Sequence, residues 1–198
     1  MAITKIKGTS SFTNLTKYDS FLAGNAAFSP GAFESIATVN GNGSSGTITF
    51  SSIPQTYTSL QIRYIGILSG TASTLRIDWG GSDYRTHKLV GNGTSASAGN
   101  SSSASFMEST DLTLGGTSAS SVIVGVGIID IHDYASTTRN KTVRVFGGID
   151  RNGSGVASLV SGFKFGDTNA VTTINFNTEN GNPFTTTTSF ALYGIKGA

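Results

Sequence analysis

The stretch from Ser121 to Ile131 constrains the fold more than any other, because apolar residues fill both of its alternating sets. Val122, Val124, Val126 and Ile128 form one set, and Ile123, Ile129 and Ile131 form most of the other. Two apolar faces are typical of a strand at the centre of a sheet. The polar residues 132–140 lead to a second alternating stretch, 141–149, which predicts a half-buried partner strand. The sequence therefore predicts a β protein with a central hairpin.

Gly125 and Gly127 lie inside this predicted central strand. Glycine in a strand interior costs entropy and supplies no side chain, so it often marks the close approach of another segment. We therefore expect another segment to lie against Gly125 and Gly127. Both are candidate docking positions.

Alternating stretches separated by turn residues continue through the chain from residue 33. They predict strands near residues 33–39, 46–53, 59–68, 74–79, 106–114, 159–165, 171–176 and 187–195. Together with the central hairpin they indicate an antiparallel β-sandwich or barrel, and we expect a jelly-roll-like sandwich. The apolar residues that we expect in its core are Ile48, Phe50, Leu60, Ile62, Leu75, Ile77, Val124, Val126, Ile128, Val143, Val145, Phe190 and Leu192.

Two stretches rich in small residues predict the connections. Residues 40–45 begin with Asn-Gly, which predicts a hairpin between the first two strands. They overlap a G-x-G-x-x-G pattern at 41–46, but dinucleotide binding needs a helix after that pattern, and a strand is predicted there. Residues 91–104 hold no apolar side chain larger than alanine, which predicts a mobile surface loop.

Residues 1–32 differ from the rest and predict an N-terminal arm that precedes a β-sandwich domain of residues 33–198. Leu15, Tyr18, Phe21 and Leu22 recur at helical spacing, which predicts a short amphipathic helix in the arm. Exposed apolar groups in such an arm would promote aggregation, so we expect them to be covered, either by the Gly125 and Gly127 patch of the same or an adjacent sandwich or by a groove on a partner. The candidate docking residues of the arm are Ile3, Ile6, Phe12, Leu15, Tyr18, Phe21, Leu22 and Phe28.

Composition excludes several classes of protein. The net charge of +2 is too small and too evenly spread for a nucleic-acid-binding protein. The chain has no cysteine, which excludes a disulfide framework, thiol catalysis and a cysteine-ligated zinc site. The first eight residues lack the apolar core of a signal peptide, and no apolar run is long enough to cross a membrane.

The strongest candidates for chemistry are Asp130, His132 and Asp133, with Asp83 and His87 as a second group. A metal site needs three or more converging ligands, and in a strand Asp130 and His132 share a face while Asp133 points away. We interpret these residues as the polar end of a strand. No serine lies in a G-x-S-x-G nucleophile elbow, and no pair of carboxylates stands out as a catalytic pair. We therefore predict no enzyme activity and no catalytic, cofactor-binding or metal-binding residues.

Aromatic residues raise the alternative of a sugar-binding surface, because aromatic faces suit carbohydrate contact. Trp79 alternates in phase with Leu75 and Ile77, however, and this pattern favours a place in the core.

Four segments of the chain resemble a known group of proteins. They are Phe33-Glu34-Ser35-Ile36-Ala37-Thr38-Val39, Gly46-Thr47-Ile48-Thr49-Phe50-Ser51-Ser52-Ile53-Pro54, Leu60-Gln61-Ile62-Arg63 and Ser189-Phe190-Ala191-Leu192-Tyr193-Gly194-Ile195-Lys196. These segments resemble small virion structural proteins of tailed bacteriophages, particularly phages of cyanobacteria and other aquatic bacteria. Members of this group are capsid decoration (cement) proteins or tail-fibre-like proteins.

The resemblance implies a function in the virion, which is assembled in the host cytoplasm. It implies a jelly-roll homotrimer that binds the major capsid protein and neighbouring copies, with an arm that reaches out to a neighbour. The chain lacks the long shaft of a receptor-binding fibre, and this favours capsid decoration. The alternative is a tail or fibre tip that binds a host-surface glycan, and an enzyme such as a depolymerase is the weakest hypothesis.

Overall fold

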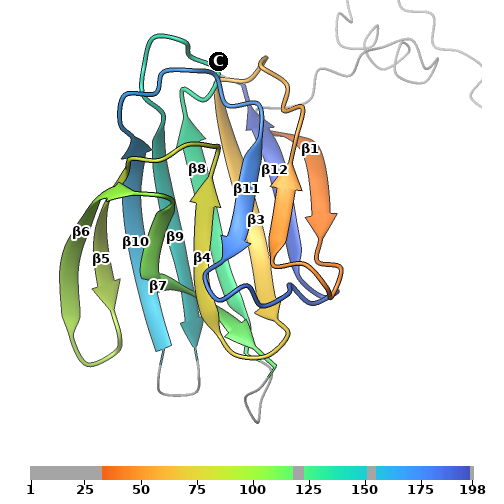
Figure 1. The fold of residues 1–198 in the computed structure, drawn as a ribbon, viewed down its shortest axis with the longest axis vertical. Helices are drawn as coiled ribbons and strands as arrows, with labels where there is room; N and C mark the ends of the chain where they lie inside the picture. Colours follow the sequence, from red (N-terminus) through yellow and green to blue (C-terminus); the bar gives the residue numbers. More distant parts are fainter. Residues whose placement is uncertain (1–32, 118–122, 151–154, 197–198) are drawn as a thin grey trace, which may run out of the picture. The chain divides into compact units, whose positions relative to one another are not determined.

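The computed structural model describes residues 33–117, 123–150 and 155–196. All the secondary-structure elements in these residues are β-strands (Figure 1). The strands are β1 (Phe33–Asn40), β2 (Thr47–Phe50), β3 (Ser59–Leu68), β4 (Ser73–Asp78), β5 (Tyr84–Gly91), β6 (Ala96–Ala104), β7 (Met107–Gly116), β8 (Gly125–His132), β9 (Thr142–Asp150), β10 (Gly155–Lys164), β11 (Ile174–Thr178) and β12 (Ser189–Ile195). The all-β prediction is confirmed for this part of the chain. The predicted helix and the docking residues of the arm lie outside the described residues.

The strands form two layers. The larger layer has the order β1-β12-β3-β8-β9-β10-β5-β6 and is antiparallel throughout. The smaller layer, β2-β11-β4-β7, lies in front of it in Figure 1 and is also antiparallel. A short parallel pairing of β3 with β7 joins the layers. The fold is thus sandwich-like, and the finer assignment to a jelly roll stays a prediction.

Aromatic side chains fill the core between the layers. Tyr64 on β3 stacks on Phe190 of β12, with ring centroids 5.2 Å apart. The ring centroid of Phe190 in turn lies 4.8 Å from that of Phe176 on β11, in the opposite layer. The core prediction is confirmed for the ten residues Ile48, Phe50, Leu60, Ile62, Leu75, Ile77, Val143, Val145, Phe190 and Leu192.

The central strand β8 and the residue before it show that the other three core predictions are wrong. Val124, Val126 and Ile128 are 37%, 48% and 37% exposed, whereas Ile129 and Ile131 are fully buried. Both sets are apolar, so the sequence pattern did not reveal which set faces inward. The inward set is the one that contains the two glycines.

Gly125 and Gly127 face the interior, where other parts of the described chain fill the space beside them. A Cβ atom on Gly127 would lie 2.6 Å from the Tyr64 ring, and one on Gly125 would lie 2.8 Å from the Thr113 carbonyl oxygen. The close approach that we expected is therefore made by β3 and β7. These two positions leave no room for a partner, so their assignment as docking residues is wrong.

The first two strands do not form the predicted hairpin. β1 pairs with β12 in the larger layer, and β2 pairs with β11 in the smaller one. The turn between them is local: the Asn42 side-chain oxygen accepts hydrogen bonds from the backbone N–H groups of Ser44 and Ser45. This turn moves the chain from one layer to the other, and the strand β2 follows its glycines.

The predicted mobile loop at residues 91–104 is wrong as well. Most of it is β6, which pairs with β5 at the edge of the larger layer. The turn before it is held by Asn92, whose side-chain oxygen accepts hydrogen bonds from the backbone N–H groups of Thr94 (3.0 Å) and Ser95 (2.8 Å). Backbone pairing needs no apolar side chains, and composition therefore misled the prediction.

Candidate docking face

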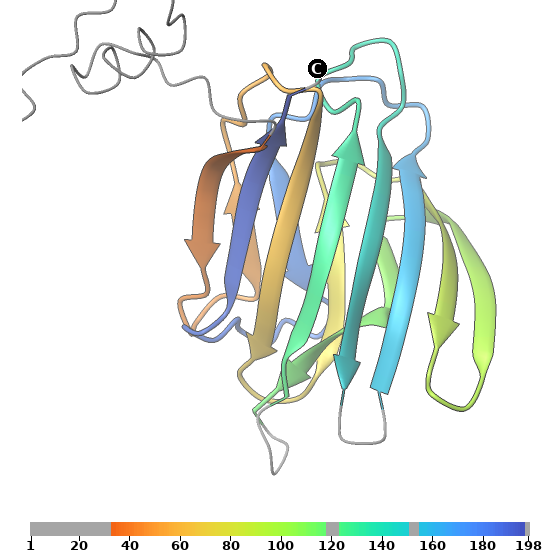
Figure 2. The same cartoon turned by 180° about the vertical axis from the view of Figure 1, so that it is seen from behind.

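The outer face of the larger layer is open, and Figure 2 shows no described element across it. Along each strand this face carries every second residue, and the registers align those residues in rows across the sheet. One row runs from Arg63 on β3 through Ile128, Phe146, Leu159 and Leu89 to Ala98 on β6. The next row runs from Ile65 through Val126, Gly148, Ala157 and Gly91 to Ala96.

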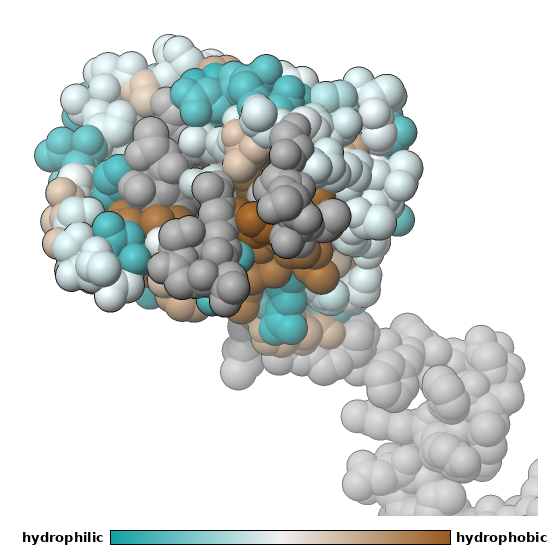
Figure 3. Space-filling view, turned by 90° about the horizontal axis from the view of Figure 1, so that it is seen from below, coloured by the Kyte–Doolittle hydropathy of each residue, from teal (hydrophilic) through white to brown (hydrophobic). Residues whose placement is uncertain are grey.

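Six large side chains in these two rows form what we call the apolar band. They are Ile65, Leu89, Val126, Ile128, Phe146 and Leu159, and each is between 37% and 61% exposed. Together they expose roughly 600 Å² of surface, at the upper end of what the largest apolar patch of a monomer shows. Apolar patches of this size mark interaction sites. Figure 3 shows that hydrophobic side chains reach the surface near the lower end of the molecule.

A polar row borders the band on the side of the 133–141 connection. It contains Gln61, Asp130, Arg144, Ser161, His87 and Asn100 in register. Gln61 donates a hydrogen bond to Asp130 (2.8 Å) and accepts one from Arg63 (3.0 Å). The face is thus divided into an apolar half and a polar half.

The residues considered for chemistry are held by neighbours on the surface. Asp130 faces Gln61, and the Asp133 carboxylate lies 2.7 Å from the Arg139 guanidinium. In the second group, the Arg85 guanidinium 3.2 Å from Asp83 holds the pKa of that carboxyl below its usual range. Across residues 33–117, 123–150 and 155–196, no group of three or more His, Asp or Glu side chains is placed to hold a metal ion.

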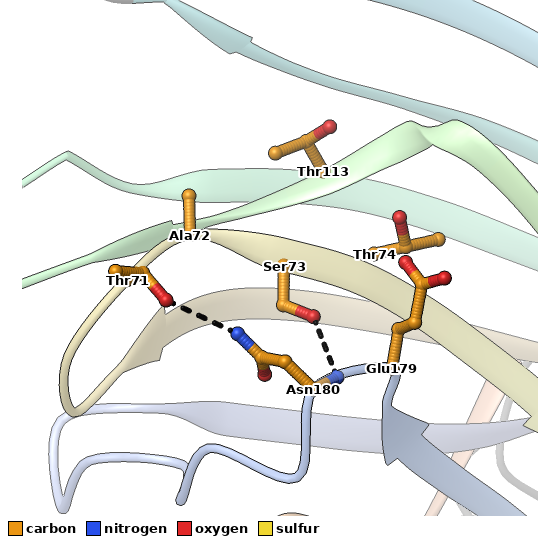
Figure 4. A pocket seen from close by; sticks show the side chains of 7 residues that line it. All are labelled: Thr71, Ala72, Ser73, Thr74, Thr113, Glu179 and Asn180. Atoms are coloured by element: carbon orange, nitrogen blue, oxygen red, sulfur yellow. Dashed lines mark hydrogen bonds between the residues drawn. The ribbon is translucent and has the colours of Figure 1, made fainter.

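A shallow depression of about 520 Å³ lies between β4 and the turn after β11 (Figure 4). It is lined by Thr71, Ala72, Ser73, Thr74, Thr113, Glu179 and Asn180. Asn180 donates from its side chain to Thr71 (3.2 Å) and from its backbone to Ser73 (3.2 Å), so the lining groups bind one another. No aromatic side chain is among the lining residues, and stacking of a sugar ring has no support here.

Trp79 packs partly buried against the core, with its ring edge-on to Tyr84 and the centroids 5.0 Å apart. The preference for the core over a sugar-stacking surface agrees with this position.

Lys141 is a buried residue that the sequence did not single out. Its ammonium group donates hydrogen bonds to the carbonyl oxygens of Ser136 (2.5 Å), Arg139 (3.1 Å) and Thr168 (2.5 Å). Burial lowers the pKa of this ammonium group. Lys141 therefore fastens two connections to each other at the end of the sandwich, and its role is structural.

Comparison with protein families, curated proteins and solved structures finds no match for this chain. In the part of the chain that the structure describes, no helix has the length and hydrophobicity to cross a membrane. The apolar band is therefore the strongest candidate functional site. Its signal in the sequence was the doubly apolar pattern of residues 122–131, which we assigned to a buried strand.

Proposed function

We propose that this chain is a structural protein of a bacteriophage virion, a capsid decoration protein that binds the outer capsid surface and neighbouring copies of itself. The observation that supports an assembly role is the apolar band. Six large apolar side chains in one exposed area are costly for a protein that works alone, since they promote unspecific association. In an assembly the same side chains become the dry centre of an interface. The phage assignment rests on the four resembling segments.

Residues 1–32 belong to this proposal as a second docking segment. Their eight large apolar side chains need cover for the same reason as the band. Deleting residues 1–28 should leave the sandwich folded, because the core side chains lie between Ile48 and Leu192. The deletion should lower affinity for the particle at least about tenfold, and unchanged affinity would show that the segment is a passive tail.

Copy number in purified virions tests the proposed function. A decoration protein that forms jelly-roll trimers on the capsid should be present in hundreds of copies, and quantitative mass spectrometry measures this number. A few to tens of copies would support the alternative of a tail or fibre tip. Absence from the particle would refute a virion role altogether.

Substitution in the band tests the observation behind the proposal. Phe146→Ser removes the most exposed side chain of the band, and Phe165→Ser removes a similarly exposed phenylalanine that lies outside it. We expect the Phe146 variant to be depleted from particles and the Phe165 variant to be retained. Equal retention of both would separate the band from assembly.

A further inference from the structure

Over the strands β9, β10 and β5 the outer face has a relief that is complementary to itself, whereas on β8 both rows carry large side chains, Ile128 and Val126. Phe146, Leu159 and Leu89 follow one another in register on β9, β10 and β5 and form a ridge. In the neighbouring row of the same three strands lie Gly148, Ala157 and Gly91, which form a trough. Gly91 opens the trough further, because a Cβ atom placed there would meet nothing within 4 Å. Ridge and trough are parallel and adjacent.

A two-fold axis parallel to the two rows and midway between them exchanges ridge and trough. When a second copy is turned about this axis and laid face to face on the first, its ridge lies over the trough of the first copy. The ridge of the first copy enters the trough of the second in the same way. A contact of this kind is isologous, since each copy contributes the same surface. Aligned packing of two sheets face to face is a common arrangement of β proteins.

Charges beside the band agree with the same axis. On β9 the axis passes at Gly147, with Phe146 and Gly148 on either side of it. Arg144 and Asp150 lie three residues before and three after Gly147, and both point outward with Phe146 and Gly148. The two-fold operation therefore places Arg144 of each copy opposite Asp150 of the other. Opposite charges that face each other across an interface favour one orientation over the alternatives.

The area is sufficient for a specific contact. The band exposes roughly 600 Å² per copy, so a contact that covered all of it would bury roughly 1,200 Å² in total, the lower end of the range for specific interfaces. The polar row of Gln61, Asp130 and Arg144 borders the band on one side, and polar groups commonly lie at the rim of protein interfaces.

We propose that the band binds a second copy of this chain, with the Phe146–Leu159–Leu89 ridge of each copy seated in the Gly148–Ala157–Gly91 trough of the other. This inference deepens the proposed function by naming the partner of the band, and it rests on that function only in treating the band as an interface. The contact pairs copies two by two, so it is distinct from the three-fold contacts of the predicted trimer.

Sedimentation of the purified full-length chain, without capsids, tests the pairing. The variant Gly91→Leu fills the trough at a position where an added Cβ atom meets nothing within 4 Å, and Phe146→Ser lowers the ridge. At concentrations near 100 µM the wild-type chain should have twice the mass of either variant, with the apparent Kd of pairing raised at least about tenfold in both. Phe165→Ser is the matched control and should pair like the wild type. Equal masses of the wild type and the band variants, whether all paired or all unpaired, would overturn the proposal.

Cysteine cross-linking tests the geometry, and the chain has no cysteine that would interfere. Leu159→Cys and Ala157→Cys lie on ridge and trough of the same strand, so the two-fold axis brings each opposite the other. A mixture of the two single variants should form disulfide-linked pairs faster than either variant alone. A mixture of Leu159→Cys with Ser161→Cys, one row into the polar border, serves as the control. Cross-linking at the same rate in both mixtures would contradict the ridge-in-trough arrangement.

These experiments use no capsids, so they separate the two proposals. A chain that does not pair but is present in hundreds of copies per virion would overturn the inference and leave the proposed function intact. Depletion of band variants from such particles would then assign the band to the capsid surface.

Discussion

Replacing Ile129 and Ile128 separately by alanine tests the orientation of the central strand with one chemical change on its two faces. Ile129 is fully buried and lies in register between Ile62 and Val145, which are also fully buried. Ile128 is 37% exposed and lies between Arg63 and Phe146 on the outer face. The two variants remove the same atoms from adjacent residues.

The structure predicts very different losses of stability. Ile129→Ala leaves a cavity between the two layers, for which large-to-small substitutions in cores cost about 2–5 kcal/mol. Ile128→Ala gives up only part of a surface contact, and about 1 kcal/mol is expected from the area involved. The free energies of unfolding of the two variants should therefore differ by at least about 1 kcal/mol.

Urea unfolding measures this difference, with far-ultraviolet circular dichroism and the fluorescence of Trp79, the single tryptophan, as two probes. The protein should be dilute, because association through the band would add stability that depends on concentration. The m-values should agree between variants, so that shifts of the midpoint report stability. Equal losses, or a larger loss for Ile128→Ala, would mean that the register of β8 is shifted by one residue and that the apolar band does not exist.

The further predictions concern three other sites of the fold. Gly127→Ala would place a Cβ atom 2.6 Å from the Tyr64 ring, and we expect a loss of about 1–3 kcal/mol that the second substitution Tyr64→Leu partly restores; additive losses would contradict this packing. Lys141→Met removes the donor of three carbonyl groups and should cost about 2 kcal/mol or more in chemical denaturation. Burial lowers the pKa of Lys141 in the folded chain, so the unfolded chain binds that proton more tightly. The free energy of unfolding of the wild type should therefore increase as the pH rises toward about 10.4, and the methionine variant should lack this contribution. Parallel pH profiles of the two proteins would refute this prediction. Asn92→Ala removes the hydrogen-bond acceptor that holds the turn before β6. Amide hydrogen exchange should therefore become faster in β6 and stay unchanged in β9. Unchanged exchange in β6 would show that other contacts hold the turn.

Sequence patterns predicted most of the strands because their alternation survives in the fold. The stretch 59–68, for example, was predicted and is observed as β3 with the same bounds. The strand β5 was missed, since Arg85, His87 and Lys88 weaken its apolar alternation. β6 was missed because its order comes from backbone pairing with β5.

The candidate site was not predicted, for a physical reason that lies in β8. An apolar residue has the same sequence signal whether its partner is the core of its own domain or another molecule. Only the neighbours decide, and for β8 the decisive neighbour is Tyr64, whose ring occupies the space beside Gly127. Tyr64 lies sixty-three residues before Gly127 in the chain, beyond the reach of any local pattern. The glycines marked the inner face, and the valines that we placed in the core form part of the outer one.

Hydroxyl-radical footprinting of intact virions tests most directly whether the apolar band is covered in the working assembly. The readout is the oxidation of Phe146 in the particle relative to the dilute free chain, with Phe165 as an internal reference of similar exposure in the free chain. Our account predicts that Phe146 is strongly protected in the particle and that Phe165 is oxidised at the same rate in both states. Oxidation of Phe146 in the particle at the rate of the free chain would contradict the account, since the band would then remain open where the protein acts.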